Sequence, residues 1–168
     1  MRVALCLILS LAVAVPAFAW EAEVIRIIDG DTLVVRRTEN GKQMRIHLYG
    51  IDAPKMPGVD WSSQCYSRTA KDFLKNILAL GSLVEVEDMG IDKNNITVAV
   101  LTLQDGKMVQ EAMLRTGLAW VYTQYCTRED ICVPFRKLEN EAKSQKRGLW
   151  VDKAPVPPWE WRIGLQCF

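Results

Sequence analysis

Residues 22–49 have the sequence AEVIRIIDGDTLVVRRTENGKQMRIHLY, in which apolar segments alternate with short polar turns. The apolar segments, which are typical of strands, are 22–28, 32–37 and 43–49. Asp-Gly-Asp separates the first two segments, and an Asn-Gly pair, which favours a hairpin, lies between the second and third. This stretch therefore predicts three consecutive strands joined by tight turns.

The third predicted strand alternates apolar and polar side chains, which indicates one buried face and one outward face. Its buried face carries Met44, Ile46 and Leu48. Its outward face, which is open to solvent or to a cleft, carries Arg45, His47 and Tyr49. A strand of this kind belongs to a sheet or barrel that encloses a core on one side only.

A helix is predicted for residues 62–80, because apolar residues recur there at the spacing of one buried stripe. The stripe consists of Ala70, Phe73, Leu74, Ile77 and Leu78. Gly81 ends this helix, and two further strands are predicted at 82–88 and 96–103.

The remaining chain is predicted to be mostly helical. The predicted elements are a helix at 108–117, an extended segment at 118–122 and a helix at 133–148. Pro134 lies near the first turn of the last helix, and Gly148 ends it. The tail from residue 154 has too many prolines for regular structure, although its aromatic residues indicate that it packs onto the body.

Five strands in a meander, with a helix inserted after the third and more helices at the end, predict the α+β class. A small closed barrel of the OB type suits this order of elements, with about three helices packed against it. The chain shows no internal repeat or low-complexity segment, so we expect one domain.

Residues 1–19, MRVALCLILSLAVAVPAFA, have the pattern of a secretory signal peptide that is cleaved before Trp20. A membrane helix is the alternative, but the apolar run is short and no basic stop-transfer cluster follows it. We therefore expect an exported bacterial protein, periplasmic or extracellular, whose single domain covers residues 20–168. No membrane segment is expected after cleavage.

The charge balance of the mature chain is neutral. The full chain has 21 Lys and Arg against 20 Asp and Glu, and cleavage removes Arg2 alone among them, leaving 20 of each. Because phosphate neutralisation supplies much of the affinity of nucleic-acid binders, neutrality argues mildly against a strong polyanion ligand. A local basic patch stays open as an alternative.

Four cysteines survive cleavage, and an even number in an exported chain predicts two disulfides. They are Cys65, Cys126, Cys132 and Cys167, which allow three pairings. Five residues separate Cys126 from Cys132, a length that can close a small loop, so we favour that bridge and obtain Cys65–Cys167 by remainder. A zinc site is the rival interpretation, but the cysteine spacing does not match the usual close pairs.

Five blocks of the sequence together carry a resemblance to a known family. They are VIRIIDGDTLVV, LYGIDAPK, DGKMVQEAMLRTGLAWVY, EAKSQKRGLW and PPWEWR, and the resemblance runs from about residue 22 to 162. In order and spacing they resemble the staphylococcal nuclease (thermonuclease-like) family. The resemblance implies an OB-fold barrel with helices beside it, and an ancestral calcium-dependent hydrolysis of DNA and RNA.

The resemblance also implies a calcium site between two carboxylates and a backbone carbonyl. The matching positions are Asp31, Asp52 and the carbonyl of Ala53, and Asp29 would support the site through water. Calcium takes oxygen ligands and draws charge away from a phosphate under attack. On its own, the Asp-Gly-Asp motif would be interpreted as a plain turn.

Three positions depart from the family's catalytic pattern. His47 and Ile96 stand where the resemblance implies phosphate-binding arginines, and Lys55 stands where it implies a glutamate that orients the attacking water. Arg45 is a possible substitute for the first arginine, but it lies about 7 Å away along the strand. A protonated lysine can neither take a proton from water nor accept its hydrogen bond, so Lys55 should weaken both catalysis and calcium binding.

Two classes of function follow from these departures. We favour a nuclease homologue with a degenerate site and little or no activity, which binds nucleic acid or an unknown ligand or protein partner and is expected to be a monomer. The alternative is an active secreted nuclease with altered catalytic residues. A candidate binding surface combines basic and aromatic side chains: Arg68, Lys71, Lys75, Tyr49, Trp61 and Tyr66. Such a set is more often an ordinary solvated helix face.

Overall fold

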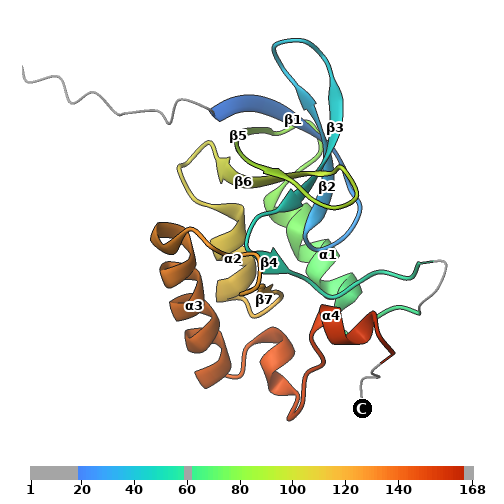
Figure 1. Cartoon of the computed structure of the whole chain (residues 1–168), viewed down its shortest axis with the longest axis vertical. Helices are drawn as coiled ribbons and strands as arrows, with labels where there is room; N and C mark the ends of the chain where they lie inside the picture. The colour runs from blue at the N-terminus through green and yellow to red at the C-terminus, as the bar shows by residue number, and fades with distance from the viewer. Residues whose placement is uncertain (1–18, 59–61, 165–168) are drawn as a thin grey trace, which may run out of the picture.

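Five strands close into a barrel in the order β1-β2-β3-β6-β5, in a computed structural model that describes residues 19–58 and 62–164 (Figure 1). The barrel strands are β1 (Ala19–Ile27), β2 (Thr32–Arg37), β3 (Gln43–Leu48), β5 (Leu83–Ile91) and β6 (Thr97–Leu103). A closed five-stranded barrel with helices beside it confirms the predicted α+β fold of the OB type.

The topology corrects the expectation of a simple meander. β3 pairs in parallel with β6, and β5 pairs antiparallel with both β1 and β6. A parallel pair cannot be joined by a hairpin, so the chain crosses over between β3 and β6. Helix α1 (Ser67–Ile77) and strand β5 lie in that connection.

The inward face of the barrel has the alternating pattern expected for strands with one buried side. Its buried residues include Val24, Leu33, Val35, Ile46, Leu48, Val84, Val86, Ala99 and Leu101. Ile46 and Leu48 are buried as predicted, whereas Met44 is half-buried near the start of β3.

The described part of the chain also contains four α-helices and one 3-10 turn. After α1, the elements are α2 (Val109–Arg115), α3 (Glu129–Ser144), the 3-10 turn η1 (Gly148–Val151) and α4 (Pro158–Trp161). Figure 1 shows α1 beside the barrel, with α2 and α3 beneath it. Among the described residues, no helix has the length and apolar character needed to cross a membrane.

Two helix predictions need correction. α3 begins at Glu129, four residues before the predicted start, so Pro134 lies inside the helix. Negative charges at Glu129 and Asp130 stabilise its first turn, and Pro134 is exposed, so the lost backbone hydrogen bond is near solvent. The tail, expected to lack regular structure, forms the single turn α4, whose Trp161 is buried.

The position of Tyr49 also differs from the prediction of an outward face. Tyr49 follows the end of β3 and is only 6% exposed. Its hydroxyl accepts hydrogen bonds from the backbone N–H groups of Thr127 and Arg128, both at 2.9 Å. Tyr49 therefore attaches the barrel to the start of α3 and is not part of the proposed binding surface. Trp61, another member of that surface, lies outside the described residues.

The chain turns sharply at Gly50 and then forms a second, two-stranded sheet. Strand β4 (Ile51–Asp52) pairs antiparallel with β7 (Trp120–Val121). The predicted Cys126–Cys132 disulfide is present, with its Cα atoms 5.8 Å apart, and packs beneath Gly50. The other predicted bridge ends at Cys167, which lies outside the described residues.

Gly50 offers a test of this packing. It has a φ of 73°, and a Cβ there would lie 2.6 Å from Sγ of Cys126. Gly50→Ala should combine left-handed strain of about 1–2 kcal/mol with about 1–3 kcal/mol of overpacking. Chemical denaturation of the oxidised protein would measure the loss of unfolding free energy.

Gly41→Ala is the matched control, because Gly41 has a φ of 71° but no heavy atom within 4 Å of the place that an alanine Cβ would take. It should show the strain alone. Equal losses in the two variants would contradict the close contact between Gly50 and the disulfide.

Candidate functional site: two carboxylates and their internal cations

The fold brings together the two carboxylates singled out in the sequence. Asp31 lies in the turn between β1 and β2, and Asp52 ends β4; each residue is only 4% exposed. Oδ2 of Asp31 accepts the backbone N–H of Ala53 at 2.7 Å, and Oδ1 accepts the hydroxyl of Thr32 at 2.8 Å. These bonds hold Asp31 beside the segment that follows β4.

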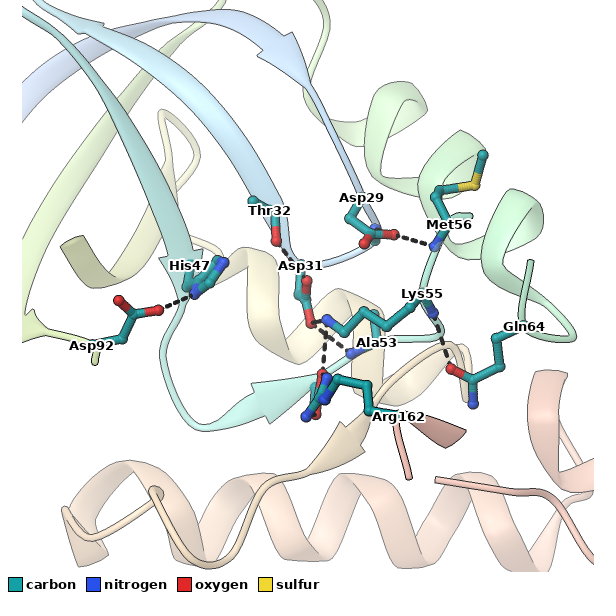
Figure 2. A network of polar contacts seen from close by, with 12 residues as sticks. Asp29, Asp31, Thr32, His47, Ala53, Lys55, Met56, Gln64, Asp92 and Arg162 are labelled. Carbon is teal, nitrogen blue, oxygen red and sulfur yellow. Dashed lines mark hydrogen bonds and ion pairs between the residues drawn. The ribbon is translucent and has the colours of Figure 1, made fainter. Parts of the chain in front are cut away.

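Lys55 places its ammonium group between the two carboxylates. Its Nζ lies 2.5 Å from Oδ2 of Asp31 and 2.8 Å from Oδ1 of Asp52 (Figure 2). The Lys55 backbone is held by Gln64, which accepts the Lys55 N–H at 3.0 Å through Oε1 and donates its own backbone N–H to the Lys55 carbonyl at 2.9 Å. The lysine is thus a fixed part of the cluster.

A second cation reaches the cluster from the C-terminal end of the described chain. Nη2 of Arg162 lies 2.9 Å from Oδ2 of Asp52. Sequence analysis missed Arg162, because the proline-rich tail gave no periodic signal. The cation in the PPWEWR block was the one signal that could have drawn attention to it. Asp52 consequently has a cation on each carboxylate oxygen.

Asp29 lies at the edge of this cluster. Its Oδ1 accepts the backbone N–H groups of Met56 at 3.1 Å and Gly30 at 3.2 Å. Burial, reinforced by the charge of Asp31, raises the pKa of Asp29 above its ordinary value. Asp29 therefore organises the loop that carries Lys55.

The charges of the cluster stabilise one another. Burial on its own would lower the pKa of Lys55, but the carboxylates of Asp31 and Asp52 raise it above its ordinary value. Burial would likewise raise the pKa of Asp31, but Lys55 and the Ala53 N–H lower it to about 2. Lys55 is therefore protonated at neutral pH and cannot act as a base.

The pKa of Asp52 is shifted in the opposite direction from that of Asp31. Burial, together with the charge of Asp31, raises the pKa of Asp52 above its ordinary value, against the opposing effects of Lys55 and Arg162. Part of the difference is that Asp31 also accepts a backbone hydrogen bond from Ala53. Asp52 therefore holds its negative charge less readily than Asp31, although it has two cationic partners.

His47 on β3 and Ile96 in the turn between β5 and β6 are connected through Asp92. Nδ1 of His47 lies 3.0 Å from Oδ2 of Asp92, and Figure 2 shows the imidazole directed toward that carboxylate. Oδ1 of Asp92 accepts the backbone N–H of Ile96 at 2.9 Å. Burial would raise the pKa of Asp92, but the backbone hydrogen bonds and His47 lower it. His47 is thus engaged with a carboxylate, as Lys55 is.

Arg45 is exposed on β3 and lies outside the contacts that join Asp31, Asp52, Lys55 and Arg162. The calcium ion that the resemblance implies does not fit this arrangement, because an ammonium group lies between the two carboxylates that would bind it. Among the described residues, no three His, Cys, Asp or Glu side chains are grouped to hold a metal ion.

Comparisons with known proteins agree with the architecture. The sequence model of the staphylococcal nuclease homologue family matches residues 45–152. An uncharacterized endonuclease of Escherichia coli O157:H7 is 42% identical over 139 residues, covering 83% of this chain and 82% of that protein. A micrococcal nuclease of Shigella flexneri is 33% identical over 161 residues, covering 90% of this chain and 86% of that protein.

A staphylococcal-like nuclease of Arabidopsis thaliana is 38% identical over 123 residues, covering 72% of this chain and 34% of that protein. The closed barrel, the helices beside it and the paired carboxylates define an OB-fold protein of the nuclease-like class. The chain belongs to the staphylococcal nuclease homologue family.

Replacing Lys55 by methionine tests the ion pairs directly. The Lys55→Met variant leaves two buried carboxylates without their shared ammonium, and we expect it to lose about 3–5 kcal/mol of unfolding free energy at pH 7. In the wild type, the depressed pKa of Asp31 contributes stability that is complete above the unfolded value of 3.8 and lost as the pH falls toward about 2.

In the Lys55→Met variant the pH dependence of stability has the opposite sign. The buried carboxylates should have pKa values above their unfolded values, so the free energy of unfolding of the variant rises as the pH falls from 7 toward 4. Urea denaturation should therefore show a smaller difference in unfolding free energy between wild type and variant at pH 4 than at pH 7. Lys75→Met, which removes a half-exposed cation from α1, is the control and should change little. A gap that widens toward pH 4 would refute the ion-pair account.

Proposed function

We propose that this protein is an exported member of the staphylococcal nuclease homologue family in which internal cations replace the catalytic metal site. It binds nucleic acid or another partner and has little or no calcium-dependent hydrolytic activity. The observation that carries the proposal is the position of the Lys55 ammonium between Asp31 and Asp52. A divalent cation at that place would face a fixed positive charge.

The groups that would perform hydrolysis are replaced by groups that cannot. Lys55 is protonated and donates hydrogen bonds only, so it cannot orient or deprotonate an attacking water. Ile96 offers no charge to a phosphate, and His47 is engaged with Asp92. Removal of one charge-stabilising group typically lowers a rate about a hundred- to a thousandfold, so the combined changes support a nearly silent site.

Binding of nucleic acid remains part of the proposal, because the family contains proteins named as nucleases. The described surface retains cations on the exposed side of α1, including Arg68 and Lys75. A neutral mature chain supports modest and salt-sensitive affinity, since each released counterion contributes separately. We propose that the protein acts as a monomer.

An active nuclease is the second candidate. It is favoured by the names of two relatives, an endonuclease that is 42% identical and a micrococcal nuclease that is 33% identical over most of the chain. Such an activity would require catalytic groups other than Lys55 and Ile96. The two candidates differ in one measurable property, which is cleavage by the wild-type protein.

Reversal of the three departures should separate these candidates. The wild type is expected to cleave single-stranded DNA with calcium no faster than the Asp31→Ala/Asp52→Ala variant. The triple variant His47→Arg/Lys55→Glu/Ile96→Arg should gain calcium-dependent cleavage, whereas single reversions should do little because these groups act as a unit. Ile96 is half-buried at a turn, so an arginine there can extend into solvent.

The matched control carries Lys55→Gln in place of Lys55→Glu, which removes the ammonium without restoring a carboxylate. It should stay inactive. Assays with calcium or a chelator from pH 5 to 9 would measure these differences. Wild-type activity equal to that of the triple variant would overturn the proposal, and a folded, calcium-binding triple variant without cleavage would show that other groups are also missing.

Export and oxidation can be tested on the secreted protein. We expect the mature chain to begin at or near Trp20 and to contain the Cys126–Cys132 and Cys65–Cys167 disulfides. Intact mass spectrometry should show a gain of about 4 Da on reduction, since each disulfide takes up two hydrogen atoms. Retention of residues 1–19, or alkylation of cysteines before reduction, would contradict this expectation.

A further inference from the structure

The segment from Asp152 to Arg162, which we call the strap, lies across the candidate site from the far end of the chain. Its helical turn α4 lies beside the loop between β4 and α1 (Figure 1). The turn has only four residues and follows several prolines, so it gains little stability from its own hydrogen bonds. Contacts with the body of the protein must therefore hold it in place.

One contact ties the strap to the residue that holds Lys55. Nε2 of Gln64 donates to the carbonyl of Val156 at 2.7 Å, while Oε1 of the same side chain accepts the Lys55 N–H. Gln64 is only 2% exposed, so it forms a buried bridge between the strap and the Lys55 loop. The strap and the internal cation thus share one support.

A second contact ties the strap to the strand that carries Asp52. The ring of Trp159 stacks on Tyr122, with centroids 5.0 Å apart and planes inclined by 6°. Tyr122 follows β7, and its N–H donates to the carbonyl of Gly50 immediately before β4. The stacked pair therefore holds the strap against the β4–β7 sheet.

Arg162 is the outer member of the cluster of charges. Its side chain is 33% exposed, whereas that of Lys55 is 13% exposed. Oδ1 of Asp52 contacts Lys55 and Oδ2 contacts Arg162, so both oxygens of this carboxylate have a cationic partner. Arg162 is therefore the more solvent-exposed of the two cationic partners of Asp52.

We propose that the strap is a closure of the candidate site that limits access to Asp52, with Arg162 acting as an internal cation that covers this carboxylate. The strap opens as a local unit while the barrel stays folded, because its attachment consists of a few separable contacts at its surface. This inference rests on the proposed function for the identity of the site, but it concerns access to Asp52 and is independent of whether the protein cleaves nucleic acid.

Hydrogen exchange tests the closure without any ligand. The reporter amides are those of Trp161, Arg162 and Ile163, which donate to carbonyls within the turn. Loss of a charge-assisted hydrogen bond in Arg162→Gln should speed their exchange about ten- to a hundredfold, while β2 and β3 stay unchanged. Arg162→Lys keeps the charge but loses the planar donor group, so its exchange rates should lie between those of the wild type and of Arg162→Gln.

Lys153→Gln is the control, because it removes the same charge from an exposed position of the strap. It should leave the exchange unchanged. Equal exchange of the reporter amides in Arg162→Gln and wild type would overturn the proposal. Acceleration that extends equally to β2 and β3 would also overturn it, because the strap would then not be a separate unit.

A calcium titration tests access to Asp52 by a second route. In a Lys55→Glu background, which restores a carboxylate to the site, Arg162→Gln should bind calcium at least about tenfold more tightly than the parent, since the competing guanidinium is gone. Lys153→Gln in the same background should match the parent. Equal calcium affinities for the Arg162 and Lys153 variants would mean that Arg162 does not cover the site. Neither measurement depends on cleavage. If the wild type proved to be an active nuclease, the proposed function would be refuted, but the strap proposal would still be tested by hydrogen exchange and calcium affinity.

Discussion

The ion pairs of Lys55 with Asp31 and Asp52 are the interaction on which the arrangement of the site depends. Two carboxylates at 4% exposure would repel each other and lose hydration if they stood alone. The ammonium group between them offsets both costs. It also connects the β1–β2 turn to β4, so that two separate parts of the fold share one charged centre.

This centre leaves little unpaired negative charge between the two carboxylates. A metal site needs negative charge that is available to an incoming cation, whereas here each carboxylate already has a partner. Lys55 and Arg162 satisfy Asp52 from two sides, and Ala53 contributes a backbone donor to Asp31. The geometry therefore favours a cluster in which the carboxylates are neutralised by internal cations over one with carboxylates available to bind a metal ion.

Other buried polar groups perform a related task away from the site. The Tyr49 hydroxyl accepts the two backbone N–H groups that precede α3. The amide of Gln110 accepts the N–H of Leu101 and donates to the carbonyl of Ala99, both on β6. Glu139 accepts the N–H of Val121. Each of these side chains is buried and hydrogen-bonds backbone groups of another element or of the chain before a helix. They fix the helices to the barrel and so set the position of β4 and Asp52.

Local patterns in the sequence determined the strands, the stripe of α1 and the short disulfide, because these features depend on residue spacing and periodicity records spacing directly. Asp31, Asp52 and Lys55 were singled out by the resemblance of several blocks of the sequence to a known family. Only the tertiary structure decided that β3 pairs in parallel with β6, that Tyr49 is buried, and that Arg162 reaches Asp52 from 110 residues away. Such contacts join segments whose separation is set by the whole chain path, so an arginine in a proline-rich tail carries no local signal of the carboxylate that it meets.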